Sequence, residues 1–238
     1  MYRFSAIYQP TTLFSLKNSN ATNSGAKSLF LPSPYAIKMA IINQAITVGN
    51  DEEILTKKNS IHFSAVKDAK ISFNLKSKND FCINNVFVKI LKLKEDKRKK
   101  EDKESGADFI YGVQETVAFR EYVHISSDLE IIFEVRNELE AMYLKKYLYK
   151  INYFGKRGCF FQFLEYKENP APSNVKEFSL KELTPGILQE YDDFPNDTTF
   201  SKVSNFSEEA GKREHKILLL PLRLKSSSKS FSFYETIK

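Results

Sequence analysis

The fold is decided by residues 129–164, which read LEIIFEVRNELEAMYLKKYLYKINYFGKRGCFFQFL. Over residues 129–135 apolar side chains alternate with glutamates, which is the period of a half-buried strand. Residues 137–149 then carry apolar side chains at helical spacing. We expect this helix to bury four side chains: Leu139, Met142, Tyr143 and Tyr147. A tight turn leads into the aromatic strand of residues 159–164, so the segment predicts a strand, a helix and a strand.

An equivalent unit precedes this segment. Residues 2–8 are rich in aromatic and β-branched side chains, which favour a strand. Ser33 and Pro34 have the order of an N-cap and a first helical residue, and Gly49 closes that helix. Residues 71–75 alternate like a second half-buried strand. The order is β-α-β-β-α-β, so we expect an α+β protein with the ferredoxin-like (RRM-like) sheet of RNA-recognition modules.

An insertion of about fifty residues separates the two central strands, and it is too long for a hairpin turn. Strand-like runs at 86–93 and 109–123 flank eleven consecutive charged residues at 94–104. Such a run stays in solvent. The pattern predicts a β-hairpin arm, or thumb, over residues 86–123.

The rest of the chain, residues 166–238, contains prolines and acidic residues before an apolar run at 217–222. Pro221 has no N–H to donate to a ladder, so it places this strand at an edge or a bulge. We therefore predict two parts. A ferredoxin-like domain at 1–165 carries the thumb, and a partly β C-terminal appendage follows at 166–238.

Composition bounds the class of protein. The chain has 238 residues, of which 42% are hydrophobic, so it can bury a core and is neither disordered nor fibrous. No apolar run reaches the roughly 18 residues of a membrane span, and the N-terminal residues lack a signal-peptide pattern. Cys82 and Cys159 form no paired motif. We therefore expect two buried thiols and a cytoplasmic protein in a reducing compartment.

The net charge of +6 is unevenly distributed. Residues 1–50 hold four basic and no acidic side chains, residues 166–215 hold six basic and ten acidic, and residues 216–238 hold five basic and one acidic. A basic N-terminal part attracts a polyanion through counterion release. Compositional fluctuation explains the same distribution, and the charges alone leave both interpretations open.

The sequence contains no nucleophile elbow, no Walker phosphate loop and no His-Glu-x-x-His pair. His62, His124 and His215 are far apart and lack metal-ligand spacing, so we expect no metal and no cofactor. His124 shares a strand face with Tyr122 and Arg120, and a histidine near a cation can cleave RNA through its 2′-hydroxyl. The alternative is an ordinary strand histidine satisfied by hydrogen bonds.

The turn Gly155-Lys156-Arg157-Gly158 is the better candidate site. Its glycines allow a tight turn whose backbone amides point toward an anion, and two cations lie between them. A solvent-facing turn is the alternative. The runs at 119–122 and 160–163 contain aromatic side chains that either stack on unpaired bases or belong to the core.

Three segments resemble those of one family. They are LPSPY at 31–35 entering the first helix, FREYV at 119–123, and FGKRG at 154–158 opening the aromatic strand. In this order, with the hairpin insertion between them, they resemble CRISPR-associated protein family five, a branch of the RAMP superfamily. The resemblance covers roughly residues 1–165 by motif and the rest by length. The loop at 155–158 is shorter than the glycine-rich loop of many RAMP proteins.

The resemblance implies a non-catalytic subunit of a type I Cascade complex, which caps the 5′ handle of the CRISPR guide RNA in antiviral defence. It implies contacts with the large subunit and the first backbone subunit, and with target DNA through the complex. The segment 86–123 would be the thumb that wedges between guide nucleotides. The expected RNA-binding residues are Lys27, Lys38, Arg120, Tyr122, Lys156 and Arg157.

Two other functions stay open. One branch of the family processes the guide precursor with tyrosine, lysine and histidine side chains. Tyr122, Lys89 and His124 would imitate that set if folding brings them together, and the chain would then be a metal-independent endoribonuclease. The other function is a protein-interaction scaffold whose basic balance is incidental and whose charged run at 94–104 tethers a partner.

Overall fold

The computed structural model describes the whole chain except residues 22–26, 58–59, 78–79, 94–112, 182–183, 205–206, 208, 210 and 238. The charged run predicted at 94–104 lies outside the described residues.

The first sheet has the predicted ferredoxin-like topology. Its strands are β1 (Tyr2–Pro10), β2 (Lys70–Asn74), β5 (Leu129–Val135) and β6 (Phe161–Glu168). They lie in the order β2-β5-β1-β6, and every neighbouring pair is antiparallel. This is the arrangement that two interlocked β-α-β units produce, so the fold prediction is confirmed.

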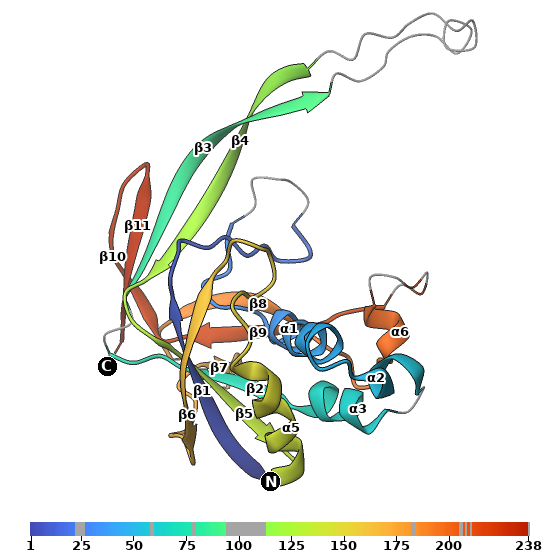
Figure 1. The fold of residues 1–238 in the computed structure, drawn as a ribbon. Coiled ribbons are helices and arrows are strands. Elements are labelled where there is room, and N and C mark those ends of the chain that lie inside the picture. The colour runs from blue at the N-terminus through green and yellow to red at the C-terminus, as the bar shows by residue number, and fades with distance from the viewer. Residues whose placement is uncertain are drawn as a thin grey trace, which may run out of the picture.

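The helices lie on one side of this sheet (Figure 1). They are α1 (Pro34–Thr47), α2 (Glu52–Thr56) and α3 (Ile61–Asp68) between β1 and β2, and α5 (Glu138–Leu148) between β5 and β6. The α2 and α3 helices were not predicted. Phe4 and Phe133 stack with ring centroids 5.2 Å apart, and the Tyr8 hydroxyl donates to the Leu148 carbonyl at 2.7 Å. The first contact packs β1 against β5 within the sheet, and the second joins the sheet to α5.

The first helix begins as predicted. The Ser33 Oγ accepts a hydrogen bond from the Ala36 amide at 3.2 Å, and Pro34 is the first helical residue. The predicted buried face of α5 is partly wrong, because Leu139 is 76% exposed and Met142 is 61% exposed. Tyr147 is buried as predicted, and the helix buries it together with Ala141, Leu144 and Leu148, which were not predicted. The buried face is rotated because it contacts α3 and β1, which the periodicity of α5 alone does not specify.

The thumb prediction is confirmed and the hairpin starts earlier than predicted. Strand β3 (Phe81–Leu93) pairs with β4 (Val113–Ile125) in one continuous antiparallel register. Phe81 and Ile125 are buried at its base, whereas Phe87 is 74% exposed farther along. Figure 1 shows the two strands extending together away from the body of the protein.

The C-terminal part forms two further sets of strands. Strands β7 (Lys176–Glu177), β8 (Ile187–Asp193) and β9 (Glu214–Leu220) form a sheet in the order β7-β9-β8, and α6 (Phe200–Val203) lies between β8 and β9. Strands β10 (Leu222–Ser227) and β11 (Phe231–Thr236) extend the thumb sheet, because β11 pairs with β3.

The predicted single strand at 217–222 is corrected, because Pro221 separates β9 from β10. Proline cannot donate a ladder hydrogen bond, so the chain changes sheets there. Tyr191, Leu220 and Leu222 belong to the same buried cluster as the first sheet. The proposed boundary between 1–165 and 166–238 stays a prediction.

Cys159 is buried as expected, and burial raises the pKa of its thiol above the ordinary value. Cys82 is only half-buried on β3, so the expectation that both thiols are buried is wrong for that residue. Among the described helices, none is long and apolar enough to cross a membrane.

Candidate nucleic-acid interface

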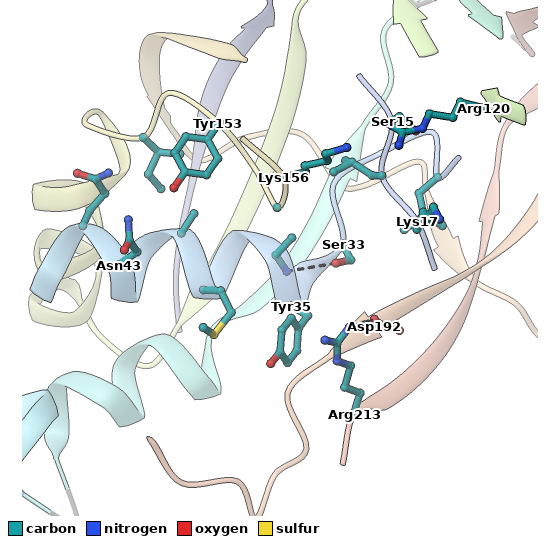
Figure 2. Close-up of a pocket in the computed structure, with 18 residues that line it drawn as sticks. Ser15, Lys17, Ser33, Tyr35, Asn43, Arg120, Tyr153, Lys156, Asp192 and Arg213 are labelled. Carbon is teal, nitrogen blue, oxygen red and sulfur yellow. Dashed lines mark hydrogen bonds and ion pairs between the residues drawn. The ribbon is translucent and has the colours of Figure 1, made fainter. Parts of the chain in front are cut away.

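A cavity of about 600 Å³ lies along α1, where the β1–α1 loop, β4, the turn before β6 and the β8–β9 region meet. Figure 2 shows the side chains around it. Its basic side chains are Lys17, Arg120, Lys156 and Arg213. The acidic side chain among its described lining residues is Asp192. The volume is that of sites which take small-molecule-sized ligands.

The first turn of α1 forms part of the wall. Ser33, Tyr35 and Ala36 line the cavity, and the first turn contains no acidic residue. The N-terminus of a helix carries partial positive charge and unpaired amides. A phosphate oxygen is stabilised next to such a terminus when cations also surround it.

A tight turn brings Lys156 to this helix end. The Cys159 amide donates to the Lys156 carbonyl at 3.1 Å, which closes the turn. Gly155 has φ +68, and a Cβ built on it would lie 3.0 Å from Leu16 Cδ2 and 3.8 Å from Ala36 Cβ. Glycine is needed here because the backbone is left-handed and packs against both neighbours. The turn therefore approaches α1 at Gly155, while all four of its residues stay exposed to solvent.

Lys17 lies on the β1–α1 loop and Arg120 on β4, and backbone hydrogen bonds join these two segments. Phe14 and Val123 exchange backbone hydrogen bonds of 3.0 and 2.7 Å, so the β1–α1 loop follows β4. The Nε atom of Arg120 is buried and has no hydrogen-bond partner among the described residues. A buried guanidinium N–H without a partner costs free energy. The Arg120 side chain also lines the cavity, so its guanidinium contributes positive charge there.

Arg213 closes the cavity near the first turn of α1. Its Nη1 lies 2.7 Å from Asp192 Oδ2, and its guanidinium carbon lies 4.3 Å from the centroid of the Tyr35 ring. His215 also contacts Asp192, with Nδ1 3.2 Å from Oδ1. The pairing with Arg213 offsets the charge of Asp192, so the cavity keeps an excess of positive charge.

The structure brings together two of the six predicted RNA-binding residues, because Arg120 and Lys156 line the same cavity. Lys27 and Arg157 are exposed, and Tyr122 is half-buried on β4. None of these three is among the described lining residues of the cavity. Lys27 precedes Ser28, whose backbone bridges to Lys17, so it lies on a loop that reaches the cavity.

Lys38 must be removed from the predicted interface. Its side chain is only 3% exposed, and Nζ lies 2.6 Å from Asp193 Oδ1 and 2.9 Å from the Lys67 carbonyl. Burial lowers the pKa of the Lys38 ammonium, and the charge of Asp193 offsets part of that shift. A lysine enclosed in this way joins elements of the protein and does not face a ligand.

Sequence reasoning missed four side chains that shape the cavity: Lys17, Tyr35, Tyr153 and Arg213. Tyr35 belongs to the LPSPY segment, and Lys17 to the basic N-terminal region, so weak signals existed for both. Arg213 lies in an acidic segment and carried no signal. Only folding places it against Tyr35.

The structure does not assemble the candidate nuclease set. Tyr122 is paired with Asn84 and His124 with Cys82, so both lie on one face of the β3–β4 ladder. Lys89 pairs with Val117 and therefore lies on the other face. Lys89 also lies five residues beyond Asn84, the partner of Tyr122, which is about 17 Å along the strand.

Comparisons with known proteins bear on the family. No family model matches the sequence. The chain is 27% identical over 229 residues to the CRISPR-associated protein Cas5 of Archaeoglobus fulgidus, and the match covers 92% of each chain. A crystal structure of a CRISPR protein from Archaeoglobus fulgidus aligns with a TM-score of 0.39 at 10% identity, over 100% of this chain and 93% of that chain. The sequence match confirms the resemblance to CRISPR-associated protein family five.

Proposed function

From its relationship to CRISPR-associated protein family five, we propose that this chain is the guide-RNA-binding subunit of a type I Cascade complex, capping the 5′ handle. The observation that supports this function is the cavity beside α1. Four cations from four separate segments converge there on a helix N-terminus. Phosphates of single-stranded RNA bind such a surface without regard to sequence.

The thumb supplies a second surface for the same ligand. Phe87 and Phe119 are cross-strand partners whose rings lie edge to face, with centroids 5.6 Å apart. Val117 and Leu91 lie on the same face and are 66% and 67% exposed. Exposed aromatic and apolar side chains stack on unpaired bases, so this face would separate neighbouring guide nucleotides.

In this proposal the chain does no chemistry and needs no cofactor. The large subunit and the first backbone subunit are its protein partners in the cytoplasm, and target DNA meets the chain through the complex. The exposed apolar face of the thumb is also suited to a protein partner. The separation of Lys89 from Tyr122 and His124 disfavours the endoribonuclease alternative.

One titration tests the proposal. Labelled repeat RNA with its 5′ handle is mixed with the full chain at two salt concentrations in the presence of a chelator. Binding and strand integrity are then measured on native and denaturing gels. A repeat RNA with a scrambled handle is the matched control.

We expect intact RNA, tighter binding of the native handle, and weaker binding at the higher salt concentration. Site-specific cleavage in chelator would make the chain an endoribonuclease. Absence of binding to either RNA at low salt would overturn the proposed function.

A further inference from the structure

The cavity has two chemically different ends. Ser33 and Asn43 are ten residues apart on the same helix, which is about 15 Å along its axis. Figure 2 shows Lys17 and Arg120 near the Ser33 end of α1, and Asn43 and Tyr153 near the other end. The first end is cationic, whereas the second presents neutral amides and an aromatic ring.

Alanines occupy the helix between these ends. Ala36 and Ala40 line the cavity on the same stripe of α1 as Asn43 and Gln44. A methyl side chain leaves room beside the helix, so a ligand can lie along α1 from one end of the cavity to the other. The cavity therefore has the shape and polarity for a ligand with an anionic head and a neutral, planar tail.

The neutral end offers hydrogen bonds that the protein does not use. Asn43 is exposed and Gln44 half-exposed, and neither side-chain amide has a hydrogen-bond partner in the part of the chain that the structure describes. Tyr153 lines the same cavity, and Figure 2 shows its ring on the Asn43 side of the close-up. A primary amide presents a donor and an acceptor side by side.

We propose that Asn43, Gln44 and Tyr153 form a base-reading subsite that takes one unstacked adenine of the bound RNA. The inference rests on the proposed function, because it assigns the RNA phosphate to the cationic end of the same cavity. Asparagine and glutamine amides match the adjacent donor and acceptor of adenine. The Tyr153 ring supplies the flat apolar surface on which an unstacked base packs.

The subsite explains why the cavity is longer than a phosphate site requires. Lys156 and the helix N-terminus need only a phosphate, which carries no sequence information. Discrimination between RNAs requires contacts to base edges. Asn43 and Gln44 are the amides that the described lining residues place at the far end of the cavity from those cations.

The test is an adenosine scan. Fluorescence anisotropy measures binding of the full chain to a twelve-nucleotide oligouridine and to variants with one adenosine at each successive position. We expect one position at which adenosine tightens binding about fivefold or more, the low end of a bidentate base contact. Guanosine at that position should not do so, because the N7 and O6 atoms of guanine are both acceptors.

The variant Asn43→Ala/Gln44→Ala should bind every oligonucleotide with the affinity of oligouridine. Alanine favours the helix, so loss of folding is not expected. Asn43→Asp/Gln44→Glu keeps the side-chain shape, removes the donors and should also lose the adenosine preference. Gln162→Ala removes an exposed amide from β6, outside the described lining of the cavity, and should leave the preference intact.

The outcomes separate the two proposals. Binding of oligouridine with no adenosine preference at any position overturns the subsite and leaves the guide-binding function standing. A preference that survives both double variants also overturns it. Failure to bind any of these RNAs, or the handle-bearing repeat, at low salt overturns the guide-binding function and the subsite together.

Discussion

The ammonium of Lys38 lies 2.6 Å from the carboxylate of Asp193, and both side chains are almost fully buried. This ion pair joins α1 to β8 across 155 positions of sequence. Both elements contribute to the cavity, β8 through Asp192 and α1 through its first turn. The C-terminal part therefore positions the wall of the candidate interface.

Asp193→Ala should destabilise the protein by about 3–5 kcal/mol, because it leaves the buried Lys38 ammonium without its carboxylate. Urea unfolding at pH 7 measures the change. Lys38→Met/Asp193→Leu removes both charges and should recover much of the loss. A double variant as unstable as the single one would show that packing, and not charge, dominates at this position.

Lys17→Ala/Lys156→Ala should weaken binding of single-stranded RNA because two phosphate contacts are lost. The slope of log K against log salt concentration should become shallower by about 1.4, at about 0.7 per contact. Lys57→Ala is the matched control, since its side chain is 65% exposed and lies outside the described cavity lining. An unchanged slope in the double variant would remove these two lysines from the interface.

Phe87→Ala should change stability by less than about 1 kcal/mol, because the side chain is 74% exposed. It should nevertheless weaken RNA binding, since the ring is available for stacking. Ile83→Ala lies on the same strand but removes a side chain that is 4% exposed, so it should cost about 2–5 kcal/mol. Thermal melts and RNA titrations of both variants distinguish a binding surface from a core surface. If Phe87→Ala binds RNA as tightly as the wild type does, the proposed role of the thumb is contradicted.

We expect the Asp51 carboxylate to make a contribution to the free energy of unfolding that is lost in acid. Burial opposes its charge, but hydrogen bonds from His62 and Tyr143 outweigh burial and hold the pKa of Asp51 below its ordinary value. The Tyr143 hydroxyl donates to Asp51 Oδ2 at 2.8 Å. Because the folded pKa is lowered, this stability is present above the unfolded pKa of about 4 and is lost as pH falls below it.

Tyr143→Phe should therefore be less stable than wild type at pH 7 and should lose less stability between pH 5 and pH 3. Urea unfolding at both pH values measures the difference. Tyr149→Phe is the control, because that side chain is 53% exposed. Equal acid losses in wild type and Tyr143→Phe would show that this hydrogen bond does not lower the pKa of Asp51.

The order of strands and helices was readable from the sequence because its signals are local. Alternation at 129–135 and at 71–75 reports which side of a strand is buried. The Ser33–Pro34 pair marks a helix start through hydrogen bonds within four residues. The buried face of α5 was misassigned at Leu139 and Met142, because partners from α3 and β1 select that face.

Only some of the residues of the candidate interface could be predicted from the sequence. Lys156 was found because two glycines surround it, and Arg120 because it lies beside aromatic residues on a strand. Lys38 has the same chemistry as Lys156, yet Asp193 encloses it. No local pattern distinguishes a paired lysine from an unpaired one.

By itself, the sequence determined the β-α-β-β-α-β order, the thumb hairpin and the family resemblance, because periodicity, helix caps and short motifs act between neighbours in the chain. The tertiary structure alone decided which cations share a cavity and which are neutralised. It brought Lys17 and Arg213 to one end of α1 and buried Lys38 against Asp193. Charge pairing and cavity shape depend on distances in space between residues far apart in the chain, and packing sets those distances.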